Sequence, residues 1–195
     1  MNRQQYLQMR AVEDRHWWYL GMRAIAQDVI ASLNLPPAAL ILDAGCGTGG
    51  NAALLERHGR FVGVDLSDLA LELAAERGRR PLARASVAAL PFPDATFDLV
   101  TSFEVLYHRA VGDDVAALAE LRRVLRPGGN LLLRLPAHEW LRGAHDAAVH
   151  TERRYTAAGL RARLAGAGLE PRRLTYLNSL LLPLAAAKRA AERLT

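Results

Sequence analysis

The sequence predicts an α/β protein with a doubly wound, mainly parallel sheet between two layers of helices. Short apolar runs alternate with helix-forming segments along most of the chain. The runs at 38–42 and 60–64 are apolar almost throughout, which is typical of parallel strands buried on both faces. A glycine cluster follows the first run directly. Such alternation implies right-handed crossovers and a three-layer αβα arrangement, with ligands bound where the strands end.

The elements follow in a regular order. Apolar positions at helical spacing predict a helical segment up to residue 33, which Pro36 and Pro37 end. Strands are predicted at 38–42, 60–64, 81–85, 97–102, 130–135 and 170–177. Helices are predicted at 51–58, 69–77, 113–125, 156–165 and 180–194. Ser67 or Asp68 is the predicted N-cap of the second of these helices, and Gly78 is its predicted terminator.

The 195 residues suit one domain, 1–195. We divide it into an N-terminal helical lid at 1–36, a cofactor-binding core at 38–136, an active-site loop at 137–155 and a helix-strand-helix at 156–195. The single cysteine excludes a disulfide framework. No apolar stretch is long enough to span a membrane, and the first residues lack a secretory signal, so we expect a cytoplasmic protein.

The charge balance raises the question of a nucleic-acid partner. The formal net charge is +5 and the pI is about 10.0. All basic residues except Lys188 are arginine, and they are spread along the chain rather than gathered in one segment. We therefore favour a small-molecule partner over nucleic acid, in a monomer or homodimer.

The glycine loop at 41–50 permits two interpretations. Gly45, Gly47 and Gly50 fit the dinucleotide fingerprint, with Asp65 at the distance expected for a ribose contact. Gly45, Gly47 and Gly49 also fit a pattern that begins with Asp43. A carboxylate at the strand tip repels a pyrophosphate but attracts a ligand with a sulfonium and an ammonium group. Asp43 thus favours S-adenosylmethionine as the ligand, with its carboxylate as part of an acidic rim.

Further motifs extend this pattern. The segments VGVDLS at 62–67, LPFPDATFDLV at 90–100 and LRRVLRPGG at 121–129 follow the glycine loop in order. Together they resemble the class I S-adenosylmethionine-dependent methyltransferases, in particular the methyltransferase type 11 group, over about residues 38–136. The resemblance implies a Rossmann-like fold and S-adenosyl-L-methionine as cofactor, with S-adenosyl-L-homocysteine as product. Segments 13–19 and 145–156 resemble a narrower bacterial subgroup of that family.

The resemblance also implies roles for individual residues. Asp65 would hold the ribose hydroxyls and Leu66 would lie against adenine, while the backbone at Ser102 and Phe103 would meet the methionine end. Two departures stand out: Ser86 replaces an aspartate frequent in the family, and the usual seventh strand is doubtful. The cofactor-binding candidates are Asp43, Gly45, Cys46, Gly47, Thr48, Gly49, Asp65, Leu66, Ser86, Val87, Ser102 and Phe103.

Residues for the acceptor come from segments outside the glycine loop. A hydroxyl acceptor benefits from a nearby base, and histidine titrates close to neutrality. The catalytic candidates are His108 and Tyr107, which follow the fourth strand, and His145 in the active-site loop. The acceptor-binding candidates are His16, Trp17, Tyr19 and Arg154. No metal site is expected, because the histidines fit no standard ligand spacing.

The predicted function is methyl transfer from S-adenosylmethionine to oxygen, nitrogen or carbon of a small molecule. Three alternatives stay open at this point. They are an RNA-directed methyltransferase, a nicotinamide-dependent oxidoreductase on a similar fold, and a cofactor-binding protein without catalysis.

Overall fold

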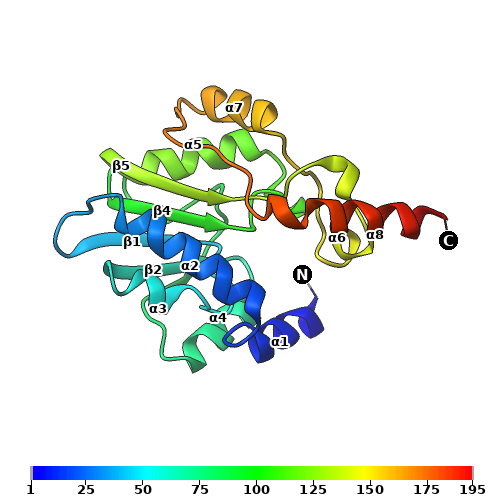
Figure 1. The fold of residues 1–195 in the computed structure, drawn as a ribbon. Coiled ribbons are helices and arrows are strands. Elements are labelled where there is room, and N and C mark those ends of the chain that lie inside the picture. The colour runs from blue at the N-terminus through cyan, green and yellow to red at the C-terminus, as the bar shows by residue number, and fades with distance from the viewer. Residues whose placement is uncertain (1, 195) are drawn as a thin grey trace.

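The described residues form a five-stranded, all-parallel sheet with helices on both faces (Figure 1). The computed structural model describes residues 2–194, so both ends of the predicted domain lie just outside the described residues. The strand order is β3-β2-β1-β4-β5. The strands are β1 (Ala39–Ala44), β2 (Gly59–Asp65), β3 (Leu82–Arg84), β4 (Phe97–Phe103) and β5 (Leu125–Arg134). The doubly wound α/β prediction is confirmed.

The helices pack in two layers. On one face lie α5 and α7, and on the other lie α2, α3 and α4 (Figure 1). The α-helices are α1 (Arg3–Val12), α2 (Trp17–Ala31), α3 (Ala52–Leu55), α4 (Asp68–Glu76), α5 (Asp114–Val124), α6 (Ala144–Ala148), α7 (Ala157–Gly166) and α8 (Leu182–Leu194). Short 3₁₀ helices are η1 (Arg109–Val111), η2 (Glu139–Leu141) and η3 (Ser179–Leu181).

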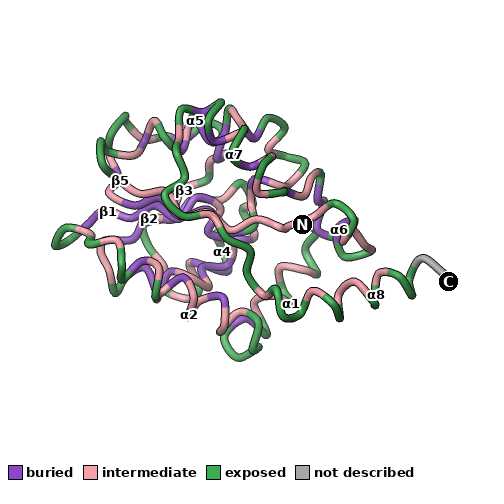
Figure 2. The backbone as a smooth tube through the Cα atoms, turned by 45° about the horizontal axis from the view of Figure 1, so that its top comes forward, coloured by how far each residue is buried: buried purple, intermediate pink, exposed green. Residues whose placement is uncertain are grey.

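Alternation along the central strands divides the core in two. In β1, Leu42 joins the cluster under α5 and α7, while its neighbour Ile41 joins the cluster under α2 and α3. Val100 and Leu99 in β4 divide in the same way. Because successive side chains point to opposite faces, strands that are apolar throughout bury both faces of the sheet. The buried sheet appears at the centre of Figure 2.

The N-terminal segment is two helices instead of one. The chain breaks between α1 and α2, where the His16 side chain accepts a hydrogen bond from the Trp18 N–H and caps α2. Histidine is a weak signal for a cap, so helical spacing alone hid this break. Most other boundaries shift by one to three residues, but β5 begins five residues earlier than predicted. Ser67 is confirmed as the N-cap of α4, and Asp113 and Thr156 cap α5 and α7.

The predicted sixth strand at 170–177 is wrong. That segment carries no strand in the structure, and its residues Pro171, Arg172 and Arg173 are exposed. Proline lacks the N–H that a ladder needs, and a segment with no paired neighbour gains nothing from extended alternation. The segment instead leads to η3 and to α8, which extends away from the body in Figure 2.

The segment predicted as an active-site loop holds more structure than expected. It contains η2 and α6, and Tyr155 at its end is buried, with its hydroxyl donating to Asp114 Oδ2 at 2.9 Å. The tyrosine ties the loop to α5. Among the described residues, no helix is long and apolar enough to cross a membrane.

Candidate active site

A cavity of about 1670 Å³ lies at the carboxyl ends of the strands. Seven segments line it: the N-terminal helices, the glycine loop after β1, the segments that follow β2, β3 and β4, the segment 133–160 and the segment 174–188. The predicted location at the strand ends agrees with this cavity.

The first position of the glycine loop, Gly45, has no room for a side chain. Gly45 has φ +89°, and a Cβ built there would lie 2.2 Å from Cγ2 of Val105. Its N–H and that of Cys46 both donate to the carbonyl of Val64 at 2.8 Å. Gly47 also has positive φ. The loop is therefore held against β2 while its backbone faces the cavity.

Asp65 stands at the end of β2 and lines the cavity. One carboxylate oxygen accepts the Gly47 N–H at 2.9 Å, and the other accepts the Ser67 N–H at 2.9 Å. Burial raises the pKa of Asp65, while these N–H groups act against that rise. Each oxygen keeps a lone pair, so the carboxylate can still accept hydrogen bonds from two ligand hydroxyls.

Asp43 does not form part of a rim, which corrects that expectation. Its side chain is 1% exposed, and it does not line the cavity. The hydroxyl of Thr101 donates to its Oδ1 at 2.8 Å, whereas Oδ2 has no hydrogen-bond partner among the described residues. Burial raises the pKa of Asp43 to about 6. This carboxylate can act on a ligand only through its field, from behind the loop.

The remaining cofactor candidates divide between the cavity wall and the layer behind it. Gly49 packs against α4, and the Ser102 hydroxyl donates to the Ala44 carbonyl at 2.9 Å, so neither lines the cavity. The candidates that do line it are Gly45, Cys46, Gly47, Thr48, Asp65, Leu66, Ser86, Val87 and Phe103. Leu66 is 49% exposed, so its side chain offers an apolar surface on which a flat ligand ring can pack.

Glu13 is a cavity residue that the sequence did not identify. It is 4% exposed, and its Oε1 accepts hydrogen bonds from the Thr48 hydroxyl and from Arg77 Nη2, both at 2.5 Å. A Cβ on Gly50 would lie 2.2 Å from the other carboxylate oxygen. Glu13 thus fixes the N-terminal helices to the glycine loop. Its only signal in the sequence was its place at the start of the segment 13–19.

The N-terminal aromatic residues stand at the cavity instead of in the core. His16, Trp17 and Tyr19 all line it, and Trp17 is 63% exposed. The ring of His16 stacks on that of Trp17, with 5.8 Å between the centroids. Helix α1 also reaches the loop, because a Cβ on Gly47 would lie 3.6 Å from Cε of Met9. This placement fits the predicted lid.

His108 lines the cavity at the N-terminus of η1. Its Nδ1 accepts the N–H of Ala110 at 3.0 Å, and burial lowers its pKa to about 4. The imidazole is therefore neutral near pH 7, and its proton lies on Nε2. This tautomer leaves His108 with an Nε2–H donor and makes it a weak base.

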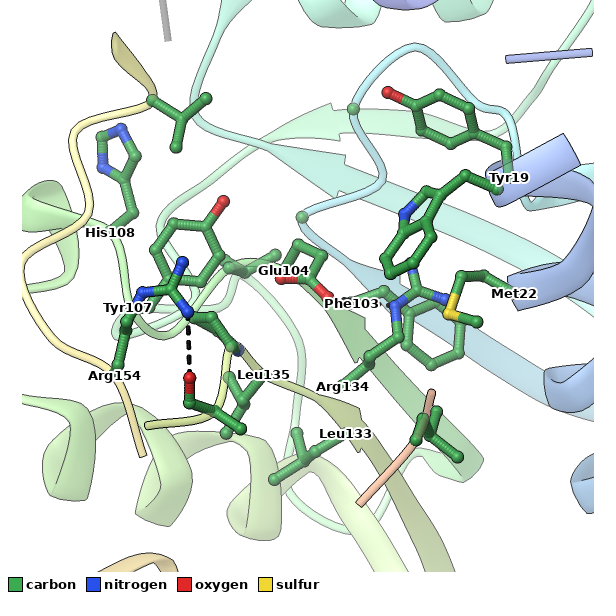
Figure 3. A pocket seen from close by; sticks show the side chains of 18 of the residues that line it. Tyr19, Met22, Phe103, Glu104, Tyr107, His108, Leu133, Arg134, Leu135 and Arg154 are labelled. Atoms are coloured by element: carbon green, nitrogen blue, oxygen red, sulfur yellow. Dashed lines mark hydrogen bonds and ion pairs between the residues drawn. The ribbon is translucent and has the colours of Figure 1, made fainter. Parts of the chain in front are cut away.

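Tyr107 and Glu104 follow β4 beside His108 (Figure 3). Burial and then the charge of Glu104 raise the pKa of Tyr107, so its phenol stays protonated. Oε1 of Glu104 accepts a hydrogen bond from Arg134 Nε at 3.1 Å. The sequence did not identify Glu104, because nothing in its local pattern shows which way a residue after a strand points.

Arg154 and His145 also line the cavity. Arg154 forms a bidentate pair with Asp146, at 2.8 and 3.1 Å, and donates to the Ala137 carbonyl at 2.9 Å. Because these N–H donors of Arg154 already bind the protein, the arginine stabilises the loop rather than binding an anionic ligand. His145 is exposed on α6. No group of three metal-ligating side chains is present among residues 2–194.

Comparisons with known proteins indicate a family for the central part of the chain. Residues 42–133 match the family described as "Methyltransferase domain". A "Probable S-adenosylmethionine-dependent methyltransferase" of Mycolicibacterium smegmatis is 34% identical over 135 residues, which cover 67% of this chain and 51% of that protein. The "Ubiquinone/menaquinone biosynthesis C-methyltransferase UbiE" of Shewanella halifaxensis is 34% identical over 131 residues, covering 60% of this chain and 51% of that protein.

Solved structures share the fold. The crystal structure of the cyclase SpnF has a TM-score of 0.70 and 26% sequence identity, covering 92% of this chain and 69% of that one. The chain spans about half the length of the two curated relatives above.

Residues 42–133 therefore belong to this methyltransferase family, as predicted, and S-adenosylmethionine is its cofactor. The residues present fit that group. The bare backbone at Gly45 and Gly47 faces the cavity, and the Asp65 carboxylate stands beside it with room for two hydroxyl donors. The methyltransferase family therefore accounts for the glycine pattern that also fits the dinucleotide fingerprint.

Proposed function

We propose that this chain is an S-adenosylmethionine-dependent methyltransferase that acts on a small molecule, in the cytoplasm and without a nucleic-acid partner. The observation that carries the proposal is the Asp65 carboxylate beside the glycine loop, inside a cavity of about 1670 Å³. That volume exceeds what one cofactor fills, since ligand pockets run from about 300 to 1,000 Å³. Space is left for an acceptor.

The cofactor supplies an activated methyl group on a sulfonium, and the chain's residues do the rest. Asp65 orients the ribose, Leu66 covers the base, and the loop backbone leaves room for close approach. The helices α1 and α2 cover the glycine loop and exclude water from the reacting atoms. Exclusion of water strengthens the polar interactions that orient the acceptor toward the methyl group.

A small acceptor is supported by the walls of the cavity. The aromatic side chains of Trp17 and Tyr19 and residues of the segment 174–185 line it. A structured RNA needs an open basic surface, whereas the cationic Arg134 and Arg154 here are paired with carboxylates. The name of the relative UbiE, a C-methyltransferase of ubiquinone and menaquinone biosynthesis, also supports a small acceptor.

The test is calorimetric titration of the full chain, in separate experiments, with S-adenosylhomocysteine, NADH and a short RNA duplex. We expect binding of S-adenosylhomocysteine alone. Asp65→Ala should weaken that binding at least about tenfold, because it removes the acceptor of two ribose hydrogen bonds. Tight binding of NADH instead would overturn the proposal, and so would retention of RNA that weakens with salt.

A control separates binding from folding. Asp68→Ala removes an exposed carboxylate of the same helix–strand junction, which pairs with Arg84 at 3.3 Å and does not line the cavity. We expect unchanged affinity in that variant.

A further inference from the structure

We propose that Glu104 binds the acceptor and takes up its proton, and that the acceptor is a neutral, largely apolar molecule with a hydroxyl group. The inference rests on the proposed function and deepens it. It replaces the histidines as the expected base with a carboxylate from the end of β4.

The backbone directs Glu104 into the cavity. Its φ is +60°, which is uncommon for a residue with a Cβ and signals a position that the surrounding structure enforces. Its N–H donates to the Arg134 carbonyl at 2.9 Å, which continues the pairing of β4 with β5 by one residue. In Figure 3 the Glu104 side chain lies between Tyr107 and Arg134, among the residues that line the pocket.

Glu104 differs from the other carboxylates of the cavity because one of its oxygens can still accept a hydrogen bond from a ligand. Glu13 is taken up by Thr48 and Arg77, and Asp146 is taken up by Arg154. Asp65 belongs to the glycine loop. Glu104 accepts from Arg134 through Oε1, and its side chain is 41% exposed because it faces the hollow. Its second oxygen can therefore accept a hydrogen bond from a ligand.

The walls around this oxygen define the acceptor's chemistry. Met22, Phe103, Leu133 and Leu135 surround Glu104 and Arg134 in the pocket (Figure 3). The guanidinium of Arg134 stacks over the Phe103 ring, 4.8 Å from its centroid, and balances the charge of Glu104. A charged acceptor would have to break this pair, whereas a neutral molecule can use the apolar walls and donate one hydrogen bond.

The protonation states suit this role. The Arg134 guanidinium beside Glu104 favours the ionised carboxylate, which can accept a hydrogen bond and then a proton. Neither His108 nor Tyr107 offers a base of this kind, because Nδ1 of His108 already accepts the Ala110 N–H and Tyr107 keeps its phenol proton.

The proton and electron balance is complete without a further reagent. The acceptor oxygen forms a bond to the methyl carbon, and the carbon–sulfur bond breaks with its electron pair going to sulfur. The hydroxyl proton moves to the free oxygen of Glu104 and then to water.

The test compares two probes with the same ring system: 2-naphthol, which has a hydroxyl donor, and 2-methoxynaphthalene, in which a methyl group replaces the hydroxyl proton. Binding of each to the full chain, saturated with S-adenosylhomocysteine, is measured by calorimetry. We expect the wild type to prefer 2-naphthol at least about tenfold, since a hydrogen bond to a charged acceptor is strong. Glu104→Gln should reduce the preference to under about threefold, because the amide oxygen accepts a weaker hydrogen bond.

The chain offers a matched control in Glu56. Its ion pair with Arg79 has nearly the same exposure as that of Glu104 with Arg134, with the carboxylate side chains 39% and 41% exposed, but it lies outside the cavity. Glu56→Gln should keep the full preference for 2-naphthol.

Two failures are distinguishable. If the wild type does not bind S-adenosylhomocysteine, the proposed function itself fails. If that ligand binds but the wild type shows no preference for 2-naphthol, or Glu104→Gln keeps the full preference, the inference about Glu104 is overturned and the methyltransferase assignment stands.

Discussion

The two sides of the cavity differ in how much of the chain each one needs. We call Gly45–Thr48 with Asp65 and Leu66 the cofactor side, and Glu104–His108 with Arg134, Tyr19 and the segment 137–155 the acceptor side. The cofactor side comes from two adjacent strand ends, and its hydrogen bonds join neighbours such as Gly47 and Asp65. The acceptor side is assembled from four distant segments.

The difference shows where each side gets its shape. Backbone geometry sets the cofactor side, because glycine conformations and strand ends leave few alternatives. Side-chain pairs set the acceptor side, such as Arg134 with Glu104 and Arg154 with Asp146. A change on the cofactor side should therefore cost stability, and one on the acceptor side should mainly change what binds.

The largest effect is expected at the first loop glycine. Gly45→Ala adds a Cβ that would lie 2.2 Å from Val105, in a residue with φ +89°. Because backbone strain and overpacking both destabilise the folded state, we expect the free energy of unfolding to fall by about 4 kcal/mol. Urea denaturation measures the loss. Gly78→Ala is the control, because Gly78 has φ +73° with nothing within 4 Å, and it should lose only about 1 kcal/mol. Equal losses in the two variants would contradict the steric argument.

The next effect concerns the contact between the N-terminal helices and the loop. Glu13→Gln breaks a buried ion pair with Arg77 and should lower the free energy of unfolding by about 3 kcal/mol. Asp14→Asn removes another partner of the same arginine, but this carboxylate is 55% exposed, and we expect a loss under about 0.5 kcal/mol. Similar values for both variants would show that burial of Glu13 is not what matters.

A smaller effect of opposite sign, a gain in the free energy of unfolding, is expected when Asp43 behind the loop is replaced. The pKa of Asp43 is raised from 3.8 to about 6, so wild-type stability falls as pH rises through this window. Asp43→Asn should gain about 2 kcal/mol at pH 7, and this gain should vanish below about pH 4. The same variant should bind S-adenosylhomocysteine more weakly. A gain that persists at low pH would contradict the electrostatic cause.

The smallest effect belongs to the acceptor side. The pKa of His108 is lowered from 6.5 to about 4, so its contribution to stability is complete above pH 6.5 and is lost as pH falls toward 4. Solvent screening of a half-buried group leaves about 1 kcal/mol of this loss. His108→Asn can still cap η1 but does not titrate, and its thermal unfolding should depend less on pH in this window. An unchanged pH profile would contradict the assignment.

The residues of the cofactor side are all among the candidates that the sequence indicated, and they line the cavity. Strand ends, glycines and Asp65 lie within short segments, and their geometry depends on neighbours along the chain or on one parallel strand pair. The errors fall where partners are distant. The strand at 170–177 failed because no neighbouring strand pairs with it, and Asp43 lies behind the loop because Thr101 holds it there.

The acceptor side shows the limit most clearly. Its candidate residues His16, Tyr19, Tyr107 and His145 do line the cavity, but Glu13 and Glu104 were missed. Their roles depend on Thr48, Arg77 and Arg134, which are between 30 and 64 residues away.

The sequence by itself determined the order of strands and helices from β1 to β5, the bend after β1 and the carboxylate at the end of β2. These depend on hydrophobic period, glycine conformation and local spacing, which are written in consecutive residues. Only the tertiary structure decided which carboxylates are occupied and which one faces the acceptor. Charge pairing and burial arise between surfaces that meet after the chain has folded, and no local pattern encodes them.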